Sequence, residues 1–284
     1  MNSAFFPGRA RGRGETPTGT RSSPRKKAGV ELAEKLLLLM TKKPLLADCQ
    51  PGTNNHSDPR SALSILCRVY PGFIRSIVGK RILDFGCGEG WQAIALAQKG
   101  AASVVGVDKN PTYVRKAREL ADRFQLRDWV TFTQSPGAFK PEFDMVISQN
   151  SMEHFSEPAK ALDEMKSALR AGGSLFITFG PPWFAPYGSH MEFMTSIPWI
   201  NIWFAENTVM RVRARFKSDR ATRYEEVEGG LNKMTVGRFE KLTAQCGMEV
   251  RYKKYECVKG MTFLASVPLI REVFINHVSY ILVK

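Results

Sequence analysis

A short apolar run followed by three alternate glycines constrains the fold of this chain more than any other feature. The run is Arg81–Phe85, and the glycines are Gly86, Gly88 and Gly90. Glycine has no Cβ, so a turn made of it lets the backbone approach a ligand closely. Residues 91–99 follow with helical spacing, which places the positive end of a helix at the turn. The sequence therefore predicts a strand, a ligand-binding turn and a helix.

A second apolar run, at residues 103–107, ends at the carboxylate of Asp108. An acidic side chain after the second strand can accept hydrogen bonds from both hydroxyls of a ribose. The glycine spacing differs from the G-x-G-x-x-G of dinucleotide folds, and Asp84 lies inside the first strand, two residues before Gly86. The two carboxylates and the glycines together are far more specific than a glycine turn alone.

Strands and helices alternate through the middle of the chain. Strands are expected at 81–85, 103–107, 130–133, 143–148 and 174–179, and helices at 91–99, 111–124 and 158–169, the last closed by Gly172 and Gly173. A further helix is expected at 235–246, with strands at 248–255 and 278–283. This alternation predicts an α/β fold with a doubly wound, mostly parallel sheet. Ligands of such sheets bind at the carboxyl ends of the strands, where the polar residues described above fall.

The motif resembles the cofactor-binding signature of the class I S-adenosylmethionine-dependent methyltransferases, D-x-G-x-G-x-G with an acidic residue after the second strand. Residues 148–154 resemble the small-molecule branch of that family, the methyltransferase type 11-like group. The resemblance implies a Rossmann-like sheet with an antiparallel C-terminal edge strand and S-adenosyl-L-methionine as cofactor. The cofactor-binding residues that it implies are Asp84, Gly86, Cys87, Gly88, Gly90, Asp108, Lys109, Gln134 and Gln149.

The segment after the fourth strand bears on the acceptor. It lacks the N/D-P-P-Y/F signature of enzymes that methylate amino groups of bases, and no T-C or P-C loop supplies a cysteine nucleophile. Both observations count against a nucleic-acid base as substrate. We expect His154 to be a general base, because an imidazole can take a proton from an attacking hydroxyl. In the alternative interpretation Glu153 and His154 only orient the next helix. Asn150 and Glu153 are predicted to contact the acceptor.

Proline and aromatic residues crowd the loop that follows the fifth strand. We predict that Trp183 and Tyr187 form a wall of the acceptor pocket and that His190 is a second candidate for a base or a substrate contact. Alternatively, these aromatic residues belong to a turn that packs on the next segment. Residues 191–217 are strongly apolar and end in a cluster of arginines, which predicts a helical lid or, alternatively, contact with a membrane surface.

The positive charge is concentrated at the start of the chain. The net charge is +14, and residues 1–30 hold seven basic residues against one acidic residue. The same segment is rich in Gly, Pro, Ser and Thr, so disorder is expected. Such an arm can contact RNA or anionic lipid, act as a transit peptide, or remain a solvated leader.

The domain organisation follows from these shifts in composition. A short helix is expected at 31–43, ended by Pro44. We assign residues 1–57 to a basic leader, this helix and a linker, and residues 58–284 to a methyltransferase domain that contains the insertion. A helix at 61–69 would place Leu63, Leu66 and Val69 on one face.

Cysteine usage and hydropathy indicate a cytoplasmic protein. The five cysteines show no C-x-x-C spacing, which suits a reducing compartment and argues against a disulfide framework or a zinc site. The run 36–40 is far too short to cross a bilayer.

The sequence as a whole predicts a methyltransferase that acts on an oxygen or nitrogen of a small, sugar or lipid-linked molecule. Peripheral membrane contact is compatible with this prediction. Two other classes stay open, namely an RNA methyltransferase that uses the basic leader and a non-catalytic scaffold that binds the cofactor.

Overall fold

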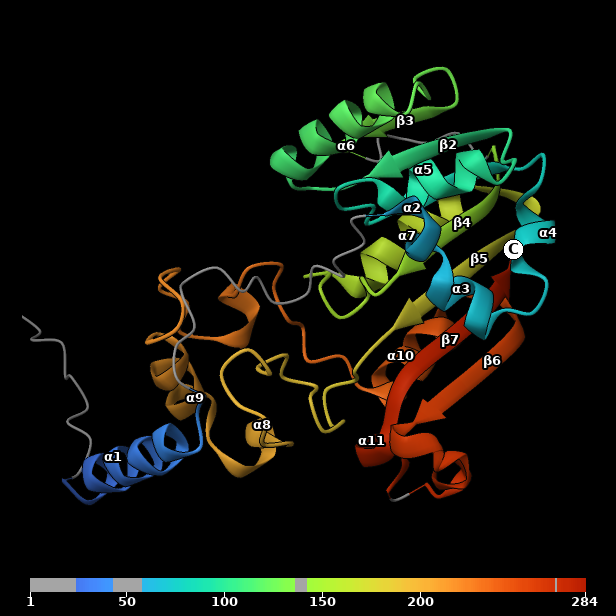
Figure 1. Ribbon diagram of the computed structural model, residues 1–284. Coiled ribbons are helices and arrows are strands. Elements are labelled where there is room, and N and C mark those ends of the chain that lie inside the picture. Colours follow the sequence, from blue (N-terminus) through green and yellow to red (C-terminus); the bar gives the residue numbers. More distant parts are fainter. Residues whose placement is uncertain (1–23, 43–57, 136–141, 269) are drawn as a thin grey trace, which may run out of the picture.

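A seven-stranded sheet with the strand order β3-β2-β1-β4-β5-β7-β6 forms the centre of the molecule (Figure 1). The computed structural model describes residues 24–42, 58–135, 142–268 and 270–284, so the expected flexible tail and linker lie largely outside it. Strands β1 to β5 pair in parallel, whereas β7 runs antiparallel to both β5 and β6. This sheet confirms the predicted Rossmann-like fold with an antiparallel C-terminal pair.

The first three strands have the bounds that the sequence predicts, and β4 is one residue longer than expected. The strands are β1 (Arg81–Phe85), β2 (Ser103–Val107), β3 (Val130–Thr133), β4 (Phe143–Gln149), β5 (Leu169–Phe179), β6 (Glu249–Cys257) and β7 (Ile275–Val283). The strand order reverses between β1 and β4. In an open parallel sheet this switch point leaves a crevice at the carboxyl ends of the two strands, and ligands bind there.

Helices cover both faces of the sheet. They are α2 (Pro59–Ala62), α3 (Ser64–Val69), α4 (Phe73–Ile77), α5 (Trp91–Gln98), α6 (Pro111–Arg123), α7 (Pro158–Ala168), α10 (Val236–Gln245) and α11 (Arg271–Phe274). Helices α2 to α6 pack in one hydrophobic core, and α7 and α10 pack in the other. Side chains of a strand alternate between these cores, as Ile82 and Leu83 do. Asp84 follows the same alternation and therefore lies on the α5 side.

The expected end of the helix before β5 is wrong. The glycine pair Gly172 and Gly173 does not close it, because α7 ends at Ala168 and Leu169 already pairs with Phe143 of β4. Leu169 is fully buried. The strand pairing with Phe143 therefore places this large apolar side chain in the core. The glycines instead lie within β5.

The N-terminal helices also differ from the prediction. The expected helix at 61–69 is divided into α2 and α3 at Leu63, although the predicted inward residues Leu63, Leu66 and Val69 are all buried. Helix α1 (Pro24–Leu39) begins inside the segment expected to be disordered, and it ends before the predicted stop at Pro44. The stability of α1 depends on packing against distant residues, which cannot be predicted from the local sequence.

Helix α1 packs on α9 (Glu206–Arg213), far from it in sequence, and together with α8 (Ile200–Trp203) they form a lobe. This lobe has its own core, in which Leu37 of α1 is buried with Met194, Ile200 and Met210. Both α8 and α9 fall within the predicted insertion at 191–217. Figure 1 shows the lobe beyond the carboxyl ends of the parallel strands, on the side of the switch point.

A substitution at Gly106 of β2 tests how tightly the sheet packs beside the glycine turn. A Cβ at this position would overlap the Phe132 ring and come within 3.0 Å of Cys87 Sγ. We expect Gly106→Ala to lower the free energy of unfolding by roughly 1–3 kcal/mol through overpacking. The measurement is urea denaturation followed by circular dichroism.

The matched control is Gly29→Ala in α1, where a Cβ meets no atom within 4 Å. This change should be neutral or stabilise by up to about 1 kcal/mol, because alanine is the better helix former. Equal stability of the two variants would contradict the packing described for β2.

Candidate active site

The turn after β1 is fixed to the end of β2 by backbone hydrogen bonds. The amides of Gly86 and Cys87 both donate to the Val107 carbonyl, at 2.8 and 2.9 Å. The amide of Gly88 donates to Asp108 Oδ2 at 2.9 Å. The predicted glycine turn and the predicted acidic residue are therefore in direct contact, although twenty residues separate Gly88 from Asp108.

The three glycines of the turn differ in what a side chain would meet at each position. All have positive φ, and a Cβ on Gly86 would lie 2.6 Å from Ser151 Oγ in the loop after β4. A Cβ on Gly90 would lie 2.8 Å from Ala117 Cβ of α6. Around Gly88 no described atom lies within 4 Å of the Cβ position. Gly86 and Gly90 thus allow close packing of the protein, whereas Gly88 borders open space where a ligand can approach the backbone.

Asp84 is a buried carboxyl group with one oxygen unpartnered. Its side chain is 1% exposed, Oδ1 accepts a hydrogen bond from Gln92 Nε2 at 2.6 Å, and Oδ2 has no partner among the described residues. Burial raises the pKa of Asp84 to about 7, and the charge of Asp108 adds to this, while the Gln92 hydrogen bond opposes it. A buried acceptor without a partner is costly, so Oδ2 fits a site for a ligand donor.

Asp108 is held in place by two backbone amides. Oδ1 accepts from Asn110 at 2.8 Å and Oδ2 accepts from Gly88. Burial raises the pKa of Asp108, and these hydrogen bonds oppose that shift. A carboxylate has about four acceptor positions, so both oxygens can still accept from a ribose. The predicted neighbours Lys109 and Gln134 lie at the ends of β2 and β3 and are exposed.

The loop after β4 carries buried polar groups on the other side of the switch point. Gln149 Oε1 is buried without a partner, and the Asn150 amide donates to the Thr178 carbonyl at 2.8 Å. Glu153 is 3% exposed, and its Oε1 accepts from the Gly180 amide at 3.3 Å. Burial raises the pKa of Glu153, with His154 opposing the shift.

The two histidines that the sequence selected lie next to each other. Their ring centroids are 5.5 Å apart in an edge-to-face arrangement. His154 Nδ1 lies 2.7 Å from the Gly230 carbonyl, which can only accept, so Nδ1 donates this hydrogen bond. His190 Nε2 is buried without a partner. Burial lowers the pKa of His190 to about 4, with a further contribution from His154.

Sequence reasoning missed the residues that hold this loop. Asn232 Nδ2 donates to the carbonyls of Met152 and Phe155, both at 2.7 Å, and the Asn232 amide donates to the Glu153 carbonyl. The Asn232 side chain therefore binds the protein's own backbone. Gln92, the partner of Asp84, was also missed, because only its position one residue into α5 places it there.

The predicted pocket wall connects the sheet to the lobe. The Trp183 ring packs edge-on against Tyr224 at 4.8 Å, and the Tyr187 hydroxyl donates to the Ser196 carbonyl at 3.2 Å. Lys233 Nζ pairs with Glu206 and Glu225, each at 2.9 Å. These aromatic residues therefore contact the lobe, and their contact with an acceptor stays a prediction.

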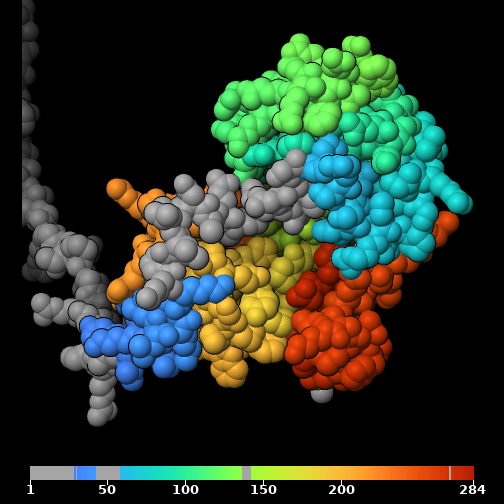
Figure 2. All heavy atoms as spheres, in the orientation of Figure 1, coloured from blue at the N-terminus to red at the C-terminus, as the bar shows by residue number. Residues whose placement is uncertain are grey.

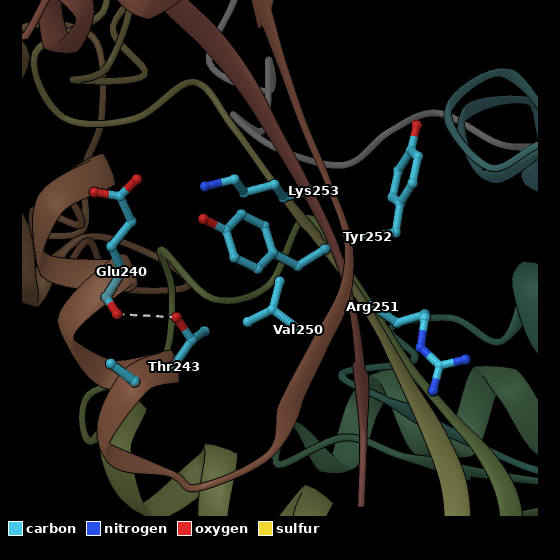
Figure 3. Close-up of a pocket in the computed structure, with 8 residues that line it drawn as sticks. Glu240, Thr243, Val250, Arg251, Tyr252 and Lys253 are labelled. Carbon is cyan, nitrogen blue, oxygen red and sulfur yellow. Dashed lines mark hydrogen bonds between the residues drawn. The ribbon is translucent and has the colours of Figure 1, made fainter.

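A separate hollow of about 460 Å³ lies at the far edge of the sheet. Figure 3 shows Glu240 and Thr243 of α10 on one side of it and Val250 to Lys253 of β6 on the other. None of the predicted site residues lines it. This hollow belongs to the antiparallel edge and not to the switch point.

The comparisons with known proteins agree with this geometry. Residues 83–177 match the model of a family described as methyltransferase domain. The tRNA U34 carboxymethyltransferase of Methylococcus capsulatus is 37% identical over 111 residues, which are 37% of this chain and 34% of that protein. The ubiquinone biosynthesis O-methyltransferase of Aeromonas salmonicida is 32% identical over 105 residues, 36% of this chain and 44% of that protein.

The structural comparison extends the similarity beyond the matched segment. Magnesium protoporphyrin IX methyltransferase from Synechocystis PCC 6803, solved with bound SAH, is 16% identical with a TM-score of 0.50, over 80% of this chain and 82% of that one. At this identity the likeness concerns the fold alone. The family match assigns residues 83–177 to a methyltransferase domain, and the structural likeness shows that the sheet around them has the fold of such an enzyme.

The similarity to curated proteins covers only part of each. This chain spans between about a third and a half of the length of the two curated relatives. The name of the first relative refers to a tRNA, and the name of the second refers to ubiquinone biosynthesis. Within the described part of the chain, no helix is both long and apolar enough to cross a bilayer.

The buried His190 gives stability a defined pH dependence. Its folded pKa of about 4 lies below the ordinary value of 6.5, so the unfolded chain binds the proton more readily in this window. Stability is therefore lost as pH falls from 6.5 towards 4, by up to roughly 3 kcal/mol. Urea denaturation across this range should show a steeper loss for the wild type than for His190→Asn.

Other groups titrate in the same window, which is why the comparison is made between two proteins. Asp84 acts in the opposite direction, because its raised pKa favours the folded state at low pH, and it is present in both. Parallel pH profiles for wild type and variant would show that His190 is not buried as described.

Proposed function

We propose that the protein transfers the methyl group of S-adenosylmethionine to an oxygen or nitrogen atom of a small, sugar or lipid-linked acceptor. The proposal is carried by one arrangement at the switch point. An Asp84 oxygen without a partner among the described residues and an open glycine backbone lie on the β1 side, and His154, held through Nδ1 by the Gly230 carbonyl, lies on the β4 side. S-adenosylmethionine supplies an electrophilic methyl group on a sulfonium when it is bound.

The residues on the β1 side fit the polar groups of this cofactor. Asp84 Oδ2 is placed to accept from an ammonium group, and its buried position makes that hydrogen bond strong. The carboxylate of Asp108 would accept from the ribose hydroxyls while the amides of Gly88 and Asn110 hold its orientation. Open space at Gly88 leaves room for the methionine portion. Cys87 is buried and serves the packing of the turn.

The residues on the β4 side would orient and deprotonate the acceptor. Because the Gly230 carbonyl accepts a hydrogen bond from Nδ1–H, the neutral ring of His154 would present Nε2 as a proton acceptor. His190 stays neutral at physiological pH and offers its unpartnered Nε2 as a hydrogen-bonding group. Methyl transfer to an aligned nucleophile also gains much from proximity alone. Asn150, Glu153, Trp183 and Tyr187 remain candidates for acceptor contacts.

Cofactor affinity is predicted to depend on pH through Asp84. Only the carboxylate binds an ammonium well, and the pKa of Asp84 is about 7, so affinity is lost as pH falls through that value. Between pH 7.5 and 6 the Kd for S-adenosylhomocysteine should rise by up to about tenfold. Isothermal titration calorimetry on Asp84→Asn should give weaker binding with little pH dependence. An unchanged pH slope in the variant would remove Asp84 from the cofactor site.

Replacing His154 separates base catalysis from alignment. If Nε2 takes the acceptor proton, His154→Gln lowers kcat by about a hundredfold or more while the Kd of the cofactor stays within about twofold. The assay is transfer of a labelled methyl group under saturating cofactor. A kcat close to that of the wild type would assign His154 to the packing of the loop instead.

The acceptor is identified by a screen with labelled cofactor. Extracts are divided into RNA, lipid, glycan and small-metabolite fractions, and the labelled fraction names the class. Label in the RNA fraction would replace this proposal with the second candidate function, an RNA methyltransferase. The similarity to a tRNA carboxymethyltransferase and the basic residues 1–30 support that function. Cofactor binding with no labelled fraction would favour a scaffold.

A further inference from the structure

Helix α1 exposes a stripe of large apolar side chains on the face that points away from the lobe. Leu32, Leu36, Leu39 and Met40 recur at helical spacing, and Leu39 is 85% exposed. On the opposite face Leu37 is fully buried against the lobe. The helix therefore carries apolar side chains on both its inner and its outer face.

The stripe continues onto the neighbouring loop and α8. Thr195 Oγ1 donates to the Met40 carbonyl at 2.8 Å and accepts from the Ile197 amide at 3.2 Å, so Ile197 lies beside the end of α1. Trp199 Nε1 donates to the Phe184 carbonyl at 3.2 Å, which brings that loop to α8. The exposed apolar residues here are Phe184, Ile197, Ile202 and Trp203, the last of them 69% exposed.

A third apolar group lies in the connection between β6 and β7. Phe263 in the short helix η3 (Thr262–Ser266) is 69% exposed, and Val267 and Ile270 are exposed beside it. In Figure 2, α1 in blue, the α8 region in yellow to orange and the β6–β7 connection in red all reach the lower edge of the molecule. A flat surface placed along that edge would touch all three segments.

The segments that contain the first two apolar groups carry a net positive charge. Residues 24–42 and 183–223, which contain the α1 and α8 groups, hold eleven Lys and Arg residues against five Asp and Glu residues. Lys42 follows Met40 at the exposed end of α1, and Lys259 lies four residues before Phe263. Lysine and arginine side chains near such a surface favour anionic lipid headgroups.

We propose that this edge, which we call the apolar rim, docks on the surface of an anionic lipid bilayer. The apolar rim consists of the exposed residues Leu32, Leu36, Leu39, Met40, Phe184, Ile197, Ile202, Trp203, Phe263, Val267 and Ile270. A bilayer interface accepts aliphatic and aromatic side chains and attracts the surrounding cations, whereas nucleic acid offers the aliphatic side chains no apolar environment. The three groups are separate, which suits a flat partner. The proposal is independent of the acceptor and of methyl transfer.

Vesicle sedimentation of the full chain tests the apolar rim. The probes are vesicles of phosphatidylcholine alone and vesicles with about 30% phosphatidylglycerol. The variant Leu39→Ser/Trp203→Ser/Phe263→Ser removes one exposed side chain from each group and leaves residues 1–23 unchanged. We expect the wild type to sediment with anionic vesicles, and the triple variant to show a partition coefficient lower by about tenfold or more.

The matched control is Trp129→Ser, because Trp129 is 48% exposed at the start of β3, at the opposite end of the sheet. Its partitioning should equal that of the wild type. Circular dichroism and binding of S-adenosylhomocysteine verify the fold, and Trp203→Ser alone replaces the triple variant if that variant fails to fold.

Three results would overturn the proposal. One is equal partitioning of the wild type and the rim variant. Another is a dimer in solution that the rim variant dissociates, which would assign the rim to a second copy of this chain. The third is that the protein binds RNA through the apolar rim and does not sediment with vesicles.

Discussion

The carbonyl of Val107 is the anchor on which the candidate site depends. The amides of Gly86 and Cys87 both donate to it, so the end of β2 determines the path of the turn after β1. The parallel register of the two strands places Phe85 beside Val107 and thereby brings this carbonyl within reach. Because Asp108 follows directly, a single register aligns the backbone of the turn and the acidic group. A slip by one residue would turn both away from the crevice.

Burial lowers the charge of the ionisable side chains in the candidate site. It raises the pKa of Asp84 and Glu153 and lowers that of His190, so each group is shifted towards its neutral form. These groups come from both sides of the switch point, and Gly86 allows the two loops to touch at Ser151. A ligand that brings a cation to Asp84 would therefore restore charge at the site, and this coupling provides selectivity for a positively charged partner.

The sequence was sufficient for those parts of the fold that depend on local patterns. Strands β1 to β3 follow from short apolar runs bounded by turns, and the motif from Asp84 to Asp108 is contiguous enough to recognise. The prediction failed where contacts between residues far apart in the sequence determine the bounds of an element. Leu169 joins β5 because Phe143 is there to pair with it, and α1 is completed by packing on α9. The pairs Asp84 with Gln92 and His154 with Gly230 required the tertiary structure.

The side chain of Asn232 has a consequence for motion within the site. Its amide group bonds the carbonyls of Met152 and Phe155, and its backbone bonds Glu153, so the loop after β4 and the segment before α10 form one unit. His154 is attached to the same unit through Gly230. A rearrangement that admits a bulky molecule would therefore either carry both segments together or break several hydrogen bonds at about 1 kcal/mol each. Such a rearrangement would involve two hydrogen-bonded segments and not a single loop.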